Sequence, residues 1–269
     1  GNSMVDYKNW IPRGMLAASG GGALVALVGV VICKISGAVQ GVRLCALILF
    51  GAVFVAFGLF FLWAAFAYRA FSYRGRRHLS KDIVEGVAAY VQLPQDGLGL
   101  DVGCGSGALT IACAKANPQA SMIGIDRWGK EYASFSKRLC ENNARAEKIG
   151  NASFQAGDAV KLDFADETFD AVVSNYVYHN IARVDRQQLL RETLRVLKKG
   201  GALLCGLDIG INYIVDQKEE RIINTFIQSL KDEGYESVEL LDTASGKFMS
   251  MRESRWLMLS DSKLLVGKK

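Results

Sequence analysis

A glycine-rich segment, LDVGCGSGALT, lies between a run of apolar residues and a run of helix-forming residues. Gly103, Gly105 and Ala108 have the G-x-G-x-x-G/A spacing with which a strand-to-helix turn brings backbone N–H groups close to a phosphate. A nicotinamide or flavin dinucleotide fits this segment. A different adenosyl cofactor on a related sheet fits it too, so the glycines alone do not name the ligand.

Three aspartates follow apolar, strand-like segments and add polar groups to this site: Asp101 in LGLDV, Asp126 in SMIGID and Asp158 in QAGDAV. Asp126 comes 18 residues after Ala108. At that distance an acid can accept hydrogen bonds from both ribose hydroxyls, so Asp126 suits either cofactor. Asp101 discriminates between them, because a carboxylate two residues before the first glycine disfavours a pyrophosphate and favours a cationic methionine ammonium group.

From Ser80 onward, strand and helix patterns alternate. The predicted strands are LGLDV, SMIGID, ASFQAG, FDAVVSN and GALLCGLDI, and YESVELLD, RWLMLS and KLLVGKK supply the last ones. The predicted helices cover 81–93, 107–116, 130–150, 186–200 and 216–234, with Ser80 as the cap of the first. Strands separated by helices indicate an α/β fold with a doubly wound, mostly parallel sheet, whose ligands bind beyond the carboxyl ends of the strands.

Five segments, taken in order, resemble the motifs of class I S-adenosylmethionine-dependent methyltransferases. They are LDVGCGSG, which is similar to D-x-G-x-G-x-G, then Asp126, GDA, FDAVVSNYVYHNI and RVLKKGGALL. The resemblance covers roughly residues 80–269. It implies a seven-stranded Rossmann-like sheet and S-adenosyl-L-methionine as the cofactor.

The resemblance also implies roles for individual residues. Asp101 would hold the methionine end of the cofactor, directly or through water. The backbone at Gly103 and Gly105 would line its path, and Asp126 would take the ribose.

The resemblance implies further roles at the adenine, at the sulfonium and at the methyl acceptor. Asp158 and the amide of Ala159 are implied for the adenine, and Asn175 would face the sulfonium end. Tyr178 and His179 follow within SNYVYHNI and are the catalytic candidates, His179 as a general base for an oxygen or nitrogen acceptor. A helix-start or packing role for His179 stays open. The six cysteines have no paired spacing, so neither a disulfide framework nor a metal site is expected.

Two uncharged segments precede this domain. Residues 14–33 and 44–68 are 20 and 25 residues long. As helices they would measure about 30 and 37 Å, against a hydrocarbon core of about 30 Å. We therefore predict two transmembrane α-helices that form a hairpin over 14–68. A cleaved signal peptide and a buried helical hairpin are the alternatives. Small residues that would allow close packing in lipid are Ala18, Gly22, Ala26, Gly51 and Gly58.

Basic residues indicate the orientation of this hairpin. The flanking ones are Lys8, Arg13, Arg69, Arg74, Arg76, Arg77 and Lys81, whereas the connecting loop holds only Lys34 and Arg43. This excess predicts a two-span protein of the cell membrane with both ends in the cytoplasm. The chain then divides into a tail (1–13, of which 1–3 are expected to be a remnant of expression), the hairpin, a basic linker (69–79) and a methyltransferase domain (80–269).

The leading hypothesis from sequence is a membrane-anchored enzyme that methylates a lipid-like or amphipathic small molecule at the cytoplasmic face. A soluble metabolite or membrane protein as acceptor, with the hairpin as anchor only, is the second hypothesis. A non-catalytic cofactor-binding module is the third. The net charge of +5 owes much to the juxtamembrane cluster, so no nucleic-acid partner is expected. The accepting atom and the oligomeric state stay open.

Overall fold

The computed structural model describes residues 4–129, 134–175, 177, 181, 185–208, 217–243 and 248–269. The chain forms two compact units. One comprises residues 9–80, and the other comprises residues 1–8 together with 81–269. The sheet and the candidate site belong to the second unit.

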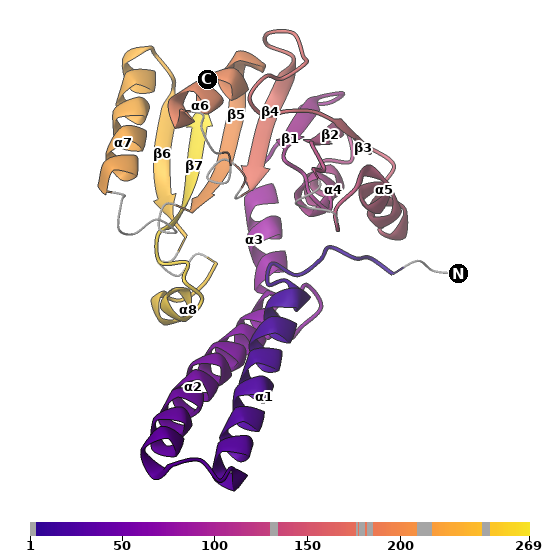
Figure 1. Ribbon diagram of the computed structural model, residues 1–269. Coiled ribbons are helices and arrows are strands. Elements are labelled where there is room, and N and C mark those ends of the chain that lie inside the picture. The colour runs from indigo at the N-terminus through magenta and orange to yellow at the C-terminus, as the bar shows by residue number, and fades with distance from the viewer. Residues whose placement is uncertain are drawn as a thin grey trace. The chain divides into compact units, whose positions relative to one another are not determined.

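This second unit is built on a seven-stranded sheet with the order β3-β2-β1-β4-β5-β7-β6 (Figure 1). The strands are β1 (Leu98–Val102), β2 (Ser121–Asp126), β3 (Ala152–Ala156), β4 (Phe169–Asn175), β5 (Leu197–Asp208), β6 (Ser237–Asp242) and β7 (Ser262–Lys268). Neighbouring strands are parallel except β7, which is antiparallel to both β5 and β6. The predicted doubly wound, mostly parallel, seven-stranded Rossmann-like sheet is therefore confirmed.

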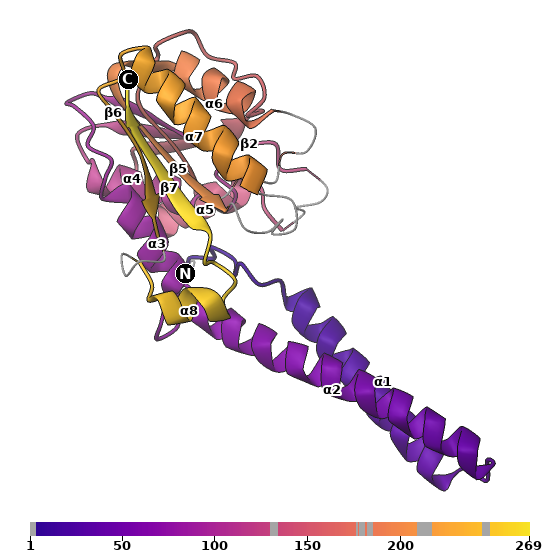
Figure 2. The same ribbon diagram turned by 90° about the vertical axis from the view of Figure 1, so that its left-hand side faces the viewer.

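Helices α4 (Ala108–Ala116), α5 (Lys137–Ala146), α6 (Arg186–Arg195) and α7 (Gln217–Asp232) pack on the sheet, and α3 (Leu79–Ala88) and α8 (Met251–Trp256) lie beyond its strand ends (Figure 1). One core cluster joins Leu100 and Phe169 of the strands to Leu190 of α6 and Phe226 of α7. Figure 2 shows α7 lying along the sheet. Helices α4 and α5 contact β1, β2 and β3. The buried apolar runs of the central strands are the reason why their pattern was readable.

Two helices begin elsewhere than predicted. The helix predicted over 130–150 begins at Lys137, where the Ser136 hydroxyl accepts a hydrogen bond from Leu139 N at 3.1 Å. Residues 130–133 lie outside the described residues. Ser80 is not a helix cap, because α3 already begins at Leu79 and the buried Ser80 hydroxyl donates to the carbonyl of Phe71.

The strand predicted over 255–260 is wrong. Residues 251–256 form α8, whose cap is the Ser250 hydroxyl accepting from Glu253 N at 3.1 Å. The strand-like pattern has another origin: Leu257 and Leu259 are buried and Met258 is exposed, because the chain turns there after the helix. A short alternation of this kind does not separate a strand from a helix end.

The first unit consists mainly of α1 (Arg13–Ile35) and α2 (Gln40–Phe71), which are long and apolar enough to cross a membrane by length and composition. They pack through glycines against aromatic rings. A Cβ on Gly29 would lie 2.5 Å from Cδ1 of Phe50, and Gly22 faces Phe57 in the same way. No atom comes within 4 Å of a Cβ built on Gly51 or Gly58, so these two glycines do not mediate the predicted close approach.

Candidate active site

The glycine-rich segment forms the turn between β1 and α4. Gly103, Gly105 and Gly107 have φ values of +75°, +54° and +84°, a region that glycine enters without strain. Gly103 is also required by the lack of space around it, because a Cβ there would lie 2.5 Å from Cγ1 of Val177. Gly107 precedes α4 without a side-chain cap, so the first-turn N–H groups of this helix face the turn with no capping side chain. Such a helix start favours an anionic group.

Asp126 fastens this turn from the end of β2. Its Oδ2 accepts a hydrogen bond from Gly105 N at 2.8 Å, and its Oδ1 accepts one from Trp128 N at 2.9 Å. The Trp128 indole N–H in turn donates to the carbonyl of Gly105 at 3.1 Å. A carboxylate has about four acceptor positions, so Asp126 keeps capacity for ligand hydroxyls. The sequence pattern pointed to Asp126 as a ligand contact and missed this second role in shaping the turn.

Asp101 lies in β1 and is only 1% exposed. Its Oδ2 accepts a hydrogen bond from the Thr110 hydroxyl at 2.6 Å. Burial raises the pKa of Asp101 to about 7, the Thr110 hydrogen bond opposes that rise, and the charge of Asp126 adds to it. A cation beside Asp101 would favour its ionised form. Thr110, the third residue of α4, is a contributor that the sequence patterns did not single out.

Asp158 follows the end of β3. Its Oδ1 accepts from Val160 N at 3.0 Å, and its Oδ2 lies 3.8 Å from Nε of Arg127. Ala159, the next residue, is buried. Asp158 thus lies close to the residue that follows Asp126, at the same sheet edge.

Asn175 ends β4 and carries the least satisfied polar atom of the site. Its Oδ1 is buried and has no hydrogen-bond partner among the described residues. A buried amide oxygen costs about 1–3 kcal/mol when unpaired, so such an atom in a native site points to a ligand or water that donates to it. Tyr178 and His179 lie outside the described residues, and their catalytic roles stay predictions.

The sheet brings these residues to one edge. Asp101 is in register with Gly124 of β2 and with Val173 of β4. Asp126 and Asn175 therefore lie two residues further along strands on either side of Asp101. Because the three strands are parallel, their carboxyl ends meet at the edge that the glycine turn also occupies (Figure 1).

Residues 4–8, the N-terminal strap, cover the glycine turn. The Ser106 hydroxyl donates to the carbonyl of Tyr7 at 3.0 Å, and Tyr7 is buried. Asn143 of α5 bonds both backbone groups of Asp6 and also donates to the carbonyl of Ser106 at 2.9 Å. The sequence pattern of the tail gives no sign of this contact.

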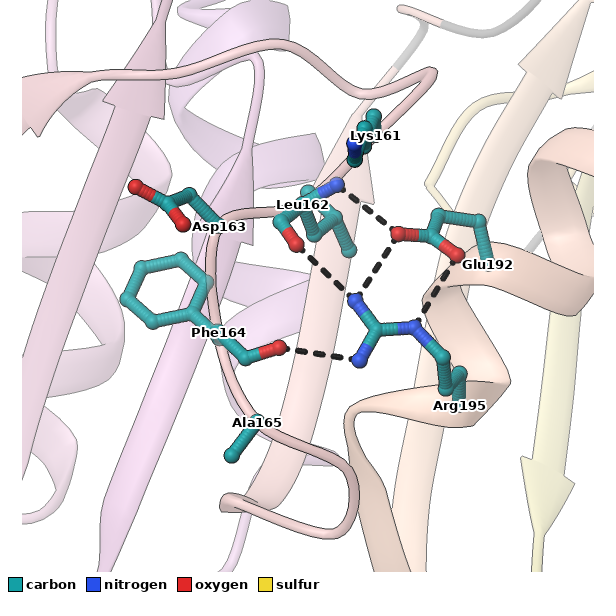
Figure 3. Close-up of a pocket in the computed structure, with 7 residues that line it drawn as sticks. All are labelled: Lys161, Leu162, Asp163, Phe164, Ala165, Glu192 and Arg195. Carbon is teal, nitrogen blue, oxygen red and sulfur yellow. Dashed lines mark hydrogen bonds and ion pairs between the residues drawn. The ribbon is translucent and has the colours of Figure 1, made fainter.

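A depression of about 430 Å³ lies beside the connection between β3 and β4 (Figure 3). Its lining residues are Lys161, Leu162, Asp163, Phe164, Ala165, Glu192 and Arg195. The Arg195 guanidinium donates to the carbonyls of Leu162 and Phe164, each at 2.9 Å, and to Glu192. The hydrogen bond from Arg195 lowers the pKa of Glu192. The donors of Arg195 are thus used inside the chain, which indicates an anchor for this connection rather than a ligand site.

Comparison with known proteins finds a family that matches the part of the chain carrying this site. Residues 100–205 match the family described as a methyltransferase domain. These residues run from β1 into β5 and include the turn and all three strand-end acids. The chain carries a class I S-adenosylmethionine-dependent methyltransferase domain.

Relatives of this methyltransferase domain agree with the match. Over 107 residues the chain is 36% identical to an uncharacterized methyltransferase of Schizosaccharomyces pombe, covering 39% of this chain and 38% of the relative. Over 110 residues it is 36% identical to the demethylmenaquinone methyltransferase of Alkalihalophilus pseudofirmus, covering 39% and 42%. The chain therefore spans about two fifths of the length of these curated relatives. The solved structure of the cyclase SpnF shares the fold, with a TM-score of 0.50 and 20% identity over 71% of this chain and 81% of that one.

Proposed function

We propose that this protein is a membrane-anchored methyltransferase that transfers a methyl group from S-adenosyl-L-methionine to a lipid-like or amphipathic small molecule at the cytoplasmic face of the cell membrane. The observation that carries the proposal is the sheet edge of the methyltransferase domain. There lie together a glycine turn, two strand-end carboxylates and the Oδ1 of Asn175, which has no hydrogen-bond partner among the residues that the structure describes.

The donor set at this edge fits the cofactor. Asp101 would take its ammonium group, and the backbone at Gly103 and Gly105 would line its methionine portion. Asp126 would accept hydrogen bonds from the ribose hydroxyls. The uncapped start of α4 suits its carboxylate.

The adenine and the sulfonium lie further along the edge in this proposal. Asp158 and the amide of Ala159 would hold the adenine. The Oδ1 of Asn175, which accepts no hydrogen bond from the described part of the chain, would face the sulfonium end, because the negative end of a carbonyl dipole is compatible with a positive charge.

When bound, the cofactor supplies a methyl group on a positively charged sulfur. The chain's own part is mainly alignment, since proximity and orientation account for several kcal/mol of a barrier of this kind. Tyr178 and His179 are proposed for the acceptor side. His179 would remove a proton only where the accepting atom carries one at neutral pH.

Two features support a lipid-like acceptor. One is the pair of apolar helices, proposed here as the anchor (14–68) and joined by the basic linker (69–79) to the catalytic domain (80–269). The other is the name of a relative, demethylmenaquinone methyltransferase, which points to a quinone-like molecule. A soluble metabolite or a membrane protein remains the second candidate, with the helices acting only as an anchor. A non-catalytic module is the third.

The test uses the full chain in detergent with methyl-labelled cofactor. One reaction receives a membrane lipid extract containing demethylmenaquinone, and a parallel one receives an extract of soluble metabolites. We expect label in the organic phase. Label confined to the aqueous phase would favour a soluble acceptor, and cofactor binding without transfer to either extract would favour the non-catalytic module. The Asp126→Ala variant should lower any true signal, whereas Asp163→Ala, an exposed acid away from the turn, should not.

A further inference from the structure

Helix α8 and the turn after it present large apolar side chains to solvent. Met251, Trp256 and Met258 are 58%, 61% and 72% exposed. Among the described residues of the sheet-bearing unit, the other exposed large apolar residues are Met4, at 77%, and Tyr90, at 37%. An exposed group of this kind marks an interaction surface more often than a scattered single residue does. We call Met251, Trp256 and Met258 the α8 patch.

The α8 patch belongs to a well-anchored segment. Leu257 and Leu259 are buried on either side of the exposed Met258, and Ser254 is fully buried. Ahead of the helix, the ring of Phe248 packs on Gly86 of α3 so closely that a Cβ there would overlap it. The exposure therefore comes from a fixed surface and not from a loose end.

Topology places α8 at the catalytic edge. Strands β5 and β6 are both antiparallel to β7, so β6 runs parallel to β5 and to the strands that carry the site. Helix α8 connects the carboxyl end of β6 to the start of β7, where Ser262 pairs with Asp208 of β5. Figure 1 shows α8 beyond these strand ends.

The polar residues of α8 suit an anionic surface. Arg252 and Arg255 are exposed, and Nη2 of Arg255 lies 3.7 Å from Sδ of Met251. Glu253, the acid between them, is only half-buried and lies in the first turn of the helix. At 3.6 residues per turn Arg252 and Arg255 lie between Met251 and Trp256 around the helix, so exposed cationic and apolar side chains stand side by side on α8. This combination is typical of segments that lie in the headgroup region of a membrane.

The proposed membrane helices and the domain that carries α8 are close along the chain. The proposed membrane helix α2 is followed after seven residues, 72–78, by α3, and α3 carries the glycine on which Phe248 packs. The α8 patch is thus attached to the helix through which the chain enters the catalytic domain. A lipid surface is therefore an obligatory neighbour of this domain if α1 and α2 span the membrane.

We propose that the α8 patch inserts into the boundary between headgroups and acyl chains of an anionic bilayer, so that the catalytic edge faces the membrane from which a lipid-like acceptor is taken. This proposal rests on the proposed membrane anchoring and deepens it. It assigns the substrate's route to one face of the catalytic domain and gives Trp256 a position in lipid.

Tryptophan emission tests the proposal without turnover. The full chain has four tryptophans. Trp10, Trp63 and Trp128 are replaced by Phe, which leaves Trp256, and a matched chain keeps only Trp128. Each is placed in vesicles of phosphatidylglycerol and phosphatidylcholine with plain or brominated acyl chains. We expect bromine to reduce Trp256 emission about twofold, because interfacial segments are buried about 5–10 Å into the boundary, and to leave Trp128 emission unchanged.

The possible outcomes separate this proposal from the proposed function. Equal Trp256 emission in plain and brominated vesicles overturns the membrane contact. Emission that changes with protein density but not with bromine also overturns it and points to a second copy of the chain. Quenching of Trp256 supports the contact even when vesicles containing demethylmenaquinone receive no methyl group, a result that would count only against the proposed acceptor.

A pair of variants links the contact to substrate access. Met251→Ser, Trp256→Ser and Met258→Ser together should keep cofactor affinity and lose most methyl transfer to vesicle-bound demethylmenaquinone. The apolar set Met251→Leu, Trp256→Phe and Met258→Leu should keep both. Equal transfer by the serine set and the apolar set would overturn the role in access.

Discussion

The side-chain amide of Asn143 makes hydrogen bonds with both the backbone N–H and the backbone carbonyl of Asp6. Its Oδ1 accepts from Asp6 N at 2.8 Å, and its Nδ2 donates to the carbonyl of Asp6 at 2.9 Å. The same Nδ2 reaches the carbonyl of Ser106 in the glycine turn at 2.9 Å. One buried amide on α5 therefore holds the N-terminal strap and the turn together.

Replacing this amide should release the strap. Asn143→Ala removes two hydrogen bonds to Asp6, each worth about 0.5–1.5 kcal/mol net, and leaves a buried carbonyl at Ser106 without this donor. We expect the amide of Asp6 to exchange with deuterium on the order of tenfold faster, because about 1.4 kcal/mol corresponds to a factor of ten. Mass spectrometry of a peptide that covers residues 4–12 measures this rate.

Asn142→Ala is the matched control, since Asn142 is adjacent on α5 and only half-buried. It should leave the exchange rate of the strap unchanged. Similar acceleration in both variants would mean that α5 itself has loosened. An unchanged exchange rate in Asn143→Ala would show that Asn143 does not hold the N-terminal strap.

Asp126 should contribute to cofactor affinity both directly and through the turn. Asp126→Ala removes a charged acceptor from the proposed ribose site and from Gly105 N. We expect a loss of about 1–3 kcal/mol in binding of S-adenosyl-L-methionine, measured by calorimetry on the full chain. Unaltered affinity would exclude Asp126 from the site, and binding of NAD in place of either adenosyl ligand would exclude the cofactor assignment.

The buried carboxyl of Asp101 predicts a pH dependence. Burial raises its pKa to about 7, so the proton is held in the unliganded chain at mildly acidic pH. In that chain the raised pKa makes stability fall as pH rises from the unfolded value near 4 to about 7. A ligand ammonium group binds the ionised carboxylate, so cofactor affinity should rise over the same window and level off above it.

Calorimetry between pH 5.5 and 8.5 tests this dependence. Asp101→Asn should bind more weakly with no rise near pH 7. Thr110→Val removes the hydrogen bond that lowers the pKa of Asp101, so it should move the rise to higher pH. A wild-type affinity that is flat across this range would show that Asp101 does not change its charge on binding.

The central strands were predictable because their signal is local. LGLDV, SMIGID and FDAVVSN are buried runs bounded by turn residues, and they coincide with β1, β2 and β4. The end of α6 was less readable. Lys198 and Lys199 read as the end of a helix, but β5 already begins at Leu197 and a register shift opposite Phe169 and Ala171 accommodates the change.

The placement of the polar residues at the strand ends was predictable from topology, whereas their hydrogen-bond partners were not. Parallel strands bring Asp101, Asp126 and Asn175 to one edge regardless of detail. The hydrogen bond between Thr110 and Asp101 depends on how α4 packs on the sheet. The hydrogen bonds of Asn143 reach Asp6, which is 137 positions away in the sequence. No periodicity records a contact between such distant residues, so only the folded chain reveals them.

The last prediction concerns the orientation of the proposed hairpin. Seven basic residues flank the uncharged segments 14–33 and 44–68 and two lie between these segments, so the connecting loop should face away from the cytoplasm. Gly37 lies in that loop, and no atom comes within 4 Å of a Cβ built there, so Gly37→Cys should be tolerated. Lys231, exposed near the end of α7, is the matched site in the catalytic domain.

Each cysteine is introduced into a chain carrying Cys33→Ser and Cys45→Ser, because the other native thiols, Cys104, Cys113, Cys140 and Cys205, are buried. An impermeant maleimide added to intact cells should label Gly37→Cys and spare Lys231→Cys, and both should react once the membrane is opened. Since the basic flanks fix both ends on one side, a single orientation should account for all of the labelling. Labelling of Lys231→Cys in intact cells would remove the cytoplasmic assignment, and labelling of neither site would remove the hairpin topology.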